Sequence, residues 1–382
     1  SGCMLRIKKT PLYGLKYPLY ASLTLSFASF GDAFLYPFLP QNAEVMDIPV
    51  VWIGLLLSIN RFIRIGFNPV VIRLFAMYGV RAVTIVASAL AIASTIGYGL
   101  GWGLFSLITF RIIWGMSFAI LRLSTLAYAF DQEYVGTALG ISRSIPEAGP
   151  MLALWWGPLL LNYFSVANTF LMLGLISGPS ILYALALPKL KYAHKIKYKI
   201  RLSLPSLLNS MTFVSSFIVE GVLIIVAGVL LTRNNASLSL LAITSMAGAY
   251  LAYRRFCSIL FAPYGGVLAD KVGFQRVFNY SMLLIIIGLI SIIVGWTAVG
   301  LIIIFSFNSI NSAMAPGGAS HTETDKIKAV AVNASWRDFG AAIGALTGGL
   351  LLSGRFLFEI LLTATFVLSF LLTIRFWQKK KI

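Results

Sequence analysis

Eight arginines lie inside long apolar stretches of this sequence, where a charged side chain needs a reason to be present. They are Arg61, Arg64, Arg111, Arg122, Arg143, Arg254, Arg255 and Arg337. Five acidic residues lie at similar depth: Asp32, Glu147, Glu220, Asp338 and Glu359. An unpaired charge at the centre of a bilayer costs at least about 2.5–3.5 kcal/mol, so such residues persist by pairing, by lining water or by binding a ligand. Five carboxylates cannot neutralise eight guanidinium groups, and the excess favours binding of an anion.

The elements that position these charges are apolar stretches long enough to cross a membrane. The chain of 382 residues is 59% hydrophobic and only 11% charged, which is outside the range of soluble proteins. About 20 apolar residues cross the ~30 Å of hydrocarbon in a bilayer. Twelve stretches reach that length: 18–40, 49–75, 82–103, 105–129, 136–163, 166–187, 206–232, 238–268, 275–296, 298–320, 329–353 and 355–378. We therefore expect an all-α membrane protein with twelve transmembrane helices.

The basic residues gather between alternate spans, and their placement predicts the topology. The net charge is +18, and the clusters fall within 6–16, 73–81, 189–201, 271–276, 326–328 and 375–381. Only Arg233 and Arg355 fall on the opposite side. By the positive-inside rule both termini are cytoplasmic, in a plasma membrane or a bacterial or archaeal inner membrane. We interpret the clusters as anchors that contact membrane lipids, with no role in binding nucleic acid.

The second half of the sequence repeats the first at an offset of 194 residues, as between Arg61 and Arg255. The same offset aligns Phe62 with Phe256, Phe67 with Phe261, Pro69 with Pro263, Gly79 with Gly273, Trp102 with Trp296, and Arg143 with Arg337. Trp, Pro and membrane-embedded Arg are scarce enough to make this recurrence significant. We expect two parallel six-helix bundles, 1–188 and 205–382, joined by a basic cytoplasmic linker at 189–204.

The loop after the eighth span carries the segment Gly266-Val-Leu-Ala-Asp270-Lys271-Val-Gly273. Its glycines permit a tight turn, and Asp270 can accept hydrogen bonds from the N-terminus of a facing helix. The segment resembles the Gly-x-x-x-Asp-Arg/Lys-x-Gly loop of the major facilitator superfamily (MFS), although the equivalent first-half position is Ala76. Arg111-Ile-Ile-Trp-Gly115 resembles a second motif of that superfamily. The resemblance implies two pseudo-symmetric bundles around a central cavity lined by helices one, four, seven and ten.

Several charges are predicted to close the cytoplasmic end of that cavity. Arg143 and Glu147 lie four residues apart on one helix face, and Arg337 lies next to Asp338. Together with Asp270 they form the predicted gate.

The repeat singles out Arg61 and Arg255 as the predicted substrate ligands. Two guanidinium groups that meet across the cavity would form a fork suited to a carboxylate, a phosphate or a similar oxyanion. Nitrate transporters of the superfamily that this sequence resembles bind their anion with Arg from the same two helices. The alternative is that the pair stays solvated or belongs to the gate. The rest of the predicted substrate site is Arg111, Asn308, Asn311 and Tyr36.

Asp32 and Glu220 are the predicted proton-coupling residues, because they lie on the first and seventh spans. A buried carboxyl group can take up and release a proton as its charged neighbours change. The alternative is that each carboxylate only balances an arginine.

These features together predict a secondary active transporter that moves a small anionic solute by alternating access, coupled to protons as an antiporter or a symporter. The alternative function is export of amphiphilic drugs or lipids, favoured by the high aromatic content. A non-transporting membrane scaffold is a third class, disfavoured by the buried charges. The sequence shows no cluster of catalytic or metal-ligating residues, so we expect no enzyme, no cofactor and no metal, and a monomer.

Overall fold

A computed structural model describes residues 15–42, 48–49, 51–101, 103–190, 205–224, 226, 240–320, 326–351 and 355–378. Its regular elements are helices, with no strand among these residues. The predicted linker falls almost wholly at 191–204, outside the described residues, as do Arg233 and the side chains of Arg355 and Glu359.

In the described part of the first half, nine helical segments cover the six predicted spans. They are α2 (Lys16–Ala28), α3 (Phe30–Asn42), α4 (Val51–Tyr78), α5 (Val80–Tyr98), α6 (Gly103–Phe130), α7 (Val135–Ser144), α8 (Ala148–Tyr163), α9 (Val166–Ile176) and α10 (Pro179–Leu185). A single 3₁₀ turn, η2 (Ile145–Glu147), joins α7 to α8. The first, fifth and sixth predicted spans are thus each built from two helices.

The second half begins with α11 (Leu207–Ser216), which continues into a π-helical turn, η3 (Phe217–Val222). Five long helices follow: α13 (Leu240–Val272), α14 (Phe274–Ile293), α15 (Thr297–Ser320), α16 (Lys326–Leu351) and α17 (Arg355–Gln378). Each of the twelve apolar stretches therefore contains helix, and the all-helical prediction is confirmed.

Six of the helical stretches are both long and apolar enough to cross a membrane. They are Leu55–Tyr78, Val80–Tyr98, Gly103–Phe130, Val166–Leu185, Phe274–Ile293 and Thr297–Ala319. Many large apolar side chains on the outside of the helices are exposed, for example Phe105 at 84% and Leu175 at 68%. Such a surface is stable only against lipid. The protein is therefore a multi-pass membrane protein, while the number of twelve crossings stays a prediction.

The two halves repeat in backbone conformation as well as in sequence. Gly79 and Gly273, one offset apart, join α4 to α5 and α13 to α14 with φ of 81° and 99°. Gly101 and Gly295 form the next matching pair, with φ of 66° and 99°. A residue with a Cβ atom rarely adopts these angles, which explains why glycine occurs at these turns in both halves.

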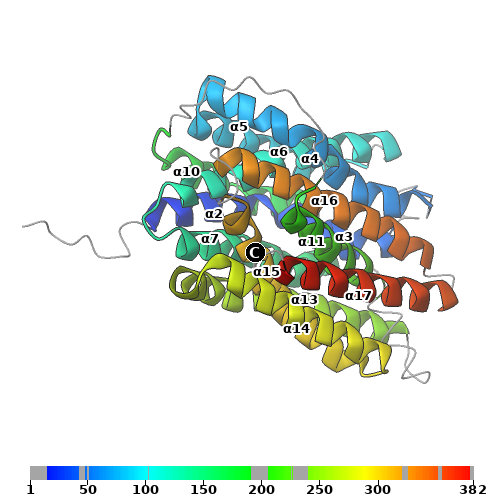
Figure 1. Cartoon of the computed structure of the whole chain (residues 1–382). Coiled ribbons are helices and arrows are strands. Elements are labelled where there is room, and N and C mark those ends of the chain that lie inside the picture. Colours follow the sequence, from blue (N-terminus) through cyan, green and yellow to red (C-terminus); the bar gives the residue numbers. More distant parts are fainter. Residues whose placement is uncertain are drawn as a thin grey trace, which may run out of the picture.

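The buried apolar residues gather into two main clusters, one built mainly from α2–α6, α8 and α9 with Ala331 of α16, and one built mainly from α11, η3, α13–α15 and α17. Two pairs of helices hold the halves together, α4 with α16 and α7 with α13. Figure 1 shows α16 (orange) reaching over to lie beside α4 (blue). The offset relates these two contacts, because α4 corresponds to α13 and α7 to the first part of α16.

Candidate functional site

A cavity of about 1440 Å³ lies between the halves, and charged side chains line it. Seven arginines reach its wall: Arg61, Arg64, Arg122, Arg143, Arg254, Arg255 and Arg337. Four carboxylates accompany them: Asp32, Glu147, Glu220 and Asp338. Ligand pockets commonly measure about 300–1,000 Å³, so this cavity exceeds what one small ion fills.

Three of the four carboxylates sit where a helix is irregular. Asp32 lies in the first turn of α3, just after the break at Ser29. Glu147 lies in the 3₁₀ turn η2, where Pro146 has no N–H to donate, and Glu220 lies in the π-helical turn η3. Such turns are frequent at functional sites because they redirect a side chain.

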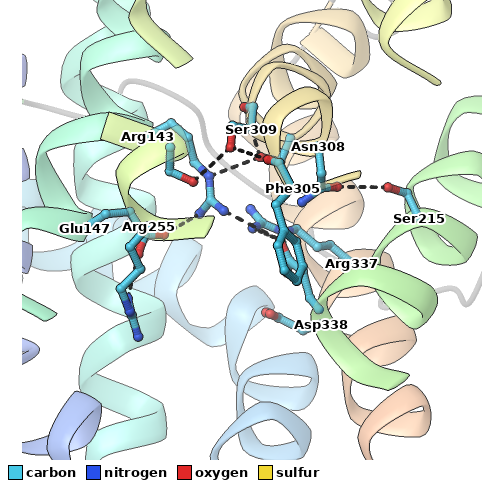
Figure 2. A network of polar contacts seen from close by, with 12 residues as sticks. Arg143, Glu147, Ser215, Arg255, Phe305, Asn308, Ser309, Arg337 and Asp338 are labelled. Atoms are coloured by element: carbon cyan, nitrogen blue, oxygen red, sulfur yellow. Dashed lines mark hydrogen bonds and ion pairs between the residues drawn. The ribbon is translucent and has the colours of Figure 1, made fainter. Parts of the chain in front are cut away.

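Glu147 forms an ion pair with each half of the protein. One carboxylate oxygen lies 3.3 Å from Nη1 of Arg143, on the same helix face, as the i,i+4 spacing predicts. The other accepts a hydrogen bond of 2.6 Å from Nη1 of Arg255 in α13. Figure 2 shows Arg143 and Arg255 beside Glu147.

Glu220 is shared between the two arginines that the repeat relates. Both of its oxygens accept hydrogen bonds from Arg337 of α16, with Nε at 3.0 Å. Nη2 of Arg143, from the other half, lies 3.6 Å from Oε1. Arg143 in addition donates from Nε to the hydroxyl of Ser312 at 3.1 Å. Glu147 and Glu220 therefore join the halves at the middle of the cavity.

Asp338 does not pair with its neighbour Arg337, which corrects the predicted pairing. Its carboxylate instead lies 3.0 Å from Nη2 of Arg64 and accepts two hydrogen bonds, at 3.0 and 3.1 Å, from Nη1 of Arg122. Adjacent residues of a helix point about 100° apart, so Arg337 and Asp338 reach different partners. The guanidinium of Arg64 also lies over the ring of Phe118, 4.5 Å from its centroid.

Arg61 and Arg255 both line the cavity but do not form the predicted symmetric fork. Arg61 donates from Nη1 to the carbonyl oxygens of Glu220 and Ala341, at 2.9 and 2.8 Å. Arg255 donates to the carboxylate of Glu147. Ala341 is the repeat counterpart of Glu147, so Arg61 and Arg255 contact equivalent positions of the other half. Only Arg255 meets a carboxylate there.

Arg111 does not line the cavity, which corrects its assignment to the substrate site. It is fully buried, donates to the carbonyls of Leu56 and Leu57, and forms an ion pair with Asp32. Its guanidinium lies 5.6 Å from the ring centroid of Tyr36, whose hydroxyl donates to the Leu57 carbonyl at 3.3 Å. Asp32 and Tyr36, whose side chains contact Arg111, do line the cavity.

The two predicted asparagines both line the cavity, but their amide groups form different hydrogen bonds within the protein. Oδ1 of Asn308 accepts from the hydroxyl of Ser215 at 3.2 Å, as Figure 2 shows. Nδ2 of Asn311 donates to Ser281 at 3.1 Å and to the Phe278 carbonyl at 3.3 Å, both on α14. The amide nitrogen of Asn311 is therefore occupied in fixing α15 against α14.

Asp270 caps the N-terminus of α7, as the loop sequence predicts. Its carboxylate accepts hydrogen bonds from the amides of Gly136 and Thr137, at 3.0 and 2.9 Å, and from the Thr137 hydroxyl at 2.9 Å. It lies at the end of α13 and outside the cavity lining. A role of this contact in gating stays a proposal.

Arg254, like Arg64 and Arg122, lines the cavity although the sequence analysis did not assign it to the site. Among the described residues, it is the lining arginine with no hydrogen bond or ion pair, and its Nε is buried without a partner. The repeat singles out Arg255 but not its neighbour Arg254, whose counterpart is Asn60, and only the direction of the side chain shows that Arg254 also reaches the cavity.

The comparisons with known proteins bear on the fold. No protein-family model matches this sequence, and no curated protein matches it. Among solved structures, the crystal structure of the human organic anion transporter MFSD10 (TETRAN) superposes with a TM-score of 0.74 over 96% of this chain and 100% of its own, at 15% sequence identity. The chain therefore has the MFS fold.

Proposed function

We propose that this protein is a secondary active transporter that carries an anionic solute across the membrane by alternating access. The observation that carries the proposal is the excess of arginine over carboxylate around the central cavity. The fold favours transport over catalysis, and the structural neighbour is described as an organic anion transporter.

The inter-half ion pairs supply a mechanism for alternating access. Arg255 with Glu147, and Arg143 with Glu220, hold the two halves together across the cavity. An anion that binds these arginines competes with the glutamates for the same donors. Binding therefore weakens the contacts between the halves, and the halves can reorient around the loaded site. Arg61 contributes similarly, because its bonds to two carbonyls of the second half can be exchanged for an anion.

The same competition supports proton coupling at Glu220. Arg337 and Arg143 supply the counter-charges of the Glu220 carboxylate. When an anion takes those donors, the carboxylate loses its counter-charges and becomes a proton acceptor. Asp32 fits this role less well, because its partner Arg111 is buried behind the cavity wall and is out of reach of a ligand.

The orientation that we propose places both termini in the cytoplasm and the closed side of the cavity inward. The tight contacts of Gly136 and Gly140 with α13 lie toward the loop of Asp270, on the predicted cytoplasmic side. The lining extends the other way, to Leu55 and Leu346 near the outer ends of α4 and α16, and to Trp155 in the middle of α8. We propose that a single chain transports as a monomer in a plasma or inner membrane.

The apolar outer wall favours a second candidate, export of amphiphilic molecules. Leu55, Leu154, Trp155, Pro158 and Ile224 line that part of a cavity larger than one small anion needs. Aromatic and aliphatic walls bind the apolar body of a drug or a lipid.

A thermal-shift screen of the purified protein, with candidate ligands grouped as anions, cations and lipids, tests the proposed function. We expect anions to raise the melting temperature. The best anion is then measured for uptake into proteoliposomes, where Arg61→Gln and Arg255→Gln together should reduce uptake at least tenfold. Arg375→Gln, at the exposed end of α17, is the matched control for charge loss. Uptake that both cavity substitutions leave unchanged would refute the proposal.

A further inference from the structure

The position of Arg254 sets it apart from the other cavity arginines. It lines the cavity on α13, where the charges of Glu147, Arg255, Glu220 and Arg61 act on it. Both glutamates accept hydrogen bonds from other arginines, Glu147 from Arg255 and Glu220 from Arg337. Arg254 is thus a cation near the centre of the cavity with no acceptor of its own among the described residues.

The charges around the cavity form groups, each with too few carboxylates. Arg64 and Arg122 share the single carboxylate of Asp338, which leaves one positive charge. Arg143, Arg254, Arg255 and Arg337 surround Glu147 and Glu220, which leaves two. Arg61 has only carbonyl acceptors, which leaves one more. Asp32 adds nothing to the balance, because Arg111 neutralises it from behind the wall.

This excess is larger than a monoanion compensates. Taking charges out of water is costly unless opposite charges and hydrogen bonds replace the lost solvation. A ligand with one negative charge leaves about three of these positive charges unmatched, and each further negative charge on the ligand removes one. The cavity is also too large and too apolar on its outer side for an inorganic ion alone.

We propose that the substrate of the anion transport described above is an organic anion with at least two negative charges and an apolar body, and that Arg254 binds one of these charges. The apolar body lies against Leu154, Trp155 and Ile224, and a second charged group is bound by Arg61 with Arg255. This inference rests on the proposed function and specifies its substrate class.

Four carboxylates that separate charge from apolar size test the proposal. Acetate and malonate carry one and two charges with almost no apolar body, while benzoate and isophthalate carry one and two charges on an aromatic ring. Binding to the full-length protein in nanodiscs is measured by isothermal titration calorimetry. We expect isophthalate to bind at least about tenfold more tightly than benzoate, since its second carboxylate gains a charge-assisted hydrogen bond, and at least about tenfold more tightly than malonate, since its ring buries apolar surface.

The variant Arg254→Gln tests the role of the arginine. It should weaken isophthalate binding about tenfold or more and leave benzoate binding within about threefold, while Arg254→Lys should restore part of the isophthalate affinity. The melting temperature without ligand should not fall, because Arg254 has no protein partner to lose. Arg337→Gln is the contrasting variant, since it removes both hydrogen bonds to Glu220 and should lower that temperature.

The outcomes separate this inference from the proposed function. Equal affinity for benzoate and isophthalate would overturn the dianion inference and leave anion transport standing. Unchanged isophthalate binding in Arg254→Gln would overturn the assignment of Arg254. If none of the four anions binds and only cations or neutral lipids do, both the inference and the proposed function fail.

Discussion

The two contacts that join the halves occupy equivalent places in the repeat, yet they use different chemistry. Between α7 and α13, glycines bring the backbones together: a Cβ atom added at Gly140 would lie 2.7 Å from the Cα atom of Pro263. Between α4 and α16, the counterparts of Gly136, Gly140 and Gly266 are the buried residues Val330, Ala334 and Ile72. One contact therefore depends on close backbone packing and the other on side chains.

The polar groups differ in the same way. Asp270 caps α7, but its counterpart is Ala76; Asp338 binds two arginines of the other half, but its counterpart is Ser144. The repeat thus determines where the halves meet, but each contact is stabilised by a different acidic residue, Asp270 between α7 and α13 and Asp338 between α4 and α16. A duplicated helix pair can keep its geometry while its stabilising interactions diverge.

The largest effect is expected at the contact between α4 and α16, where Asp338 forms its ion pairs. Asp338→Asn leaves the buried Arg64 and the partly exposed Arg122 without a carboxylate, which should destabilise the protein by about 3 kcal/mol. Thermal melting of the purified variant measures this, and Ser144→Ala is the control, because it removes only one hydrogen bond to the carbonyl of Ile259. Equal melting temperatures for the two variants would contradict the comparison.

A smaller effect is expected from overpacking the contact between α7 and α13, where glycines bring the backbones together. Gly140→Ala places a methyl group against the backbone of Ala262 and Pro263, which should cost about 1–3 kcal/mol and slow uptake by opposing closure of this side. The counterpart change, Ala334→Gly, introduces no clash, and its cost of about 1 kcal/mol comes from helix propensity. Uptake should fall in the first variant and persist in the second; the reverse order would show that the α4–α16 contact limits closure.

The helix cap should contribute about 1 kcal/mol. Asp270→Ala leaves the amides of Gly136 and Thr137 without their acceptor, and the melting temperature should fall accordingly. The reciprocal change Ala76→Asp should not raise the melting temperature. The repeat counterpart of Gly136 is Val330, which lies more than one turn inside α16. Amides at such a position already bond within the helix, so an acid at position 76 has no free amide to accept from. A stabilising Ala76→Asp would show that a second cap is available.

The smallest effect is expected for the neutral hydrogen bond of the α4–α16 contact. Nδ2 of Asn68 donates to the hydroxyl of Ser335 at 3.0 Å. A double-mutant cycle of Asn68→Ala and Ser335→Ala should give a coupling of about 0.5 kcal/mol, at the low end for a neutral hydrogen bond. A coupling as large as that between Arg64 and Asp338 would mean that charge is not what distinguishes this contact.

Much of the fold could be read from the sequence because it follows from local rules. Apolar length predicts the helices, and the helix ends differ from the predicted ends by a few residues. The offset between Arg61 and Arg255 predicts the repeat, and the positive φ of both Gly79 and Gly273 shows it in the backbone. The interruption of the first span at Ser29 and the π-helical turn at Glu220 were not predicted, because apolar length carries no information about hydrogen-bond register.

The candidate site was predicted in composition but not in pairing. Spacing along one helix face predicts Arg143 with Glu147, and the loop motif predicts Asp270 at a helix N-terminus. Adjacency in sequence gave the wrong partner for Arg337, and the predicted substrate site included Arg111, which is fully buried outside the cavity lining.

By itself the sequence determined a helical membrane protein of two related halves with more buried arginine than acid, because hydrophobicity, periodicity and charge count are properties of the chain alone. Only the tertiary structure decided that Glu220 joins Arg143 to Arg337, that Asp338 binds Arg64 and Arg122, and that Arg254 is left without a partner. A long guanidinium side chain can reach several acids. Which one it meets depends on how helices far apart in the sequence are rotated against each other.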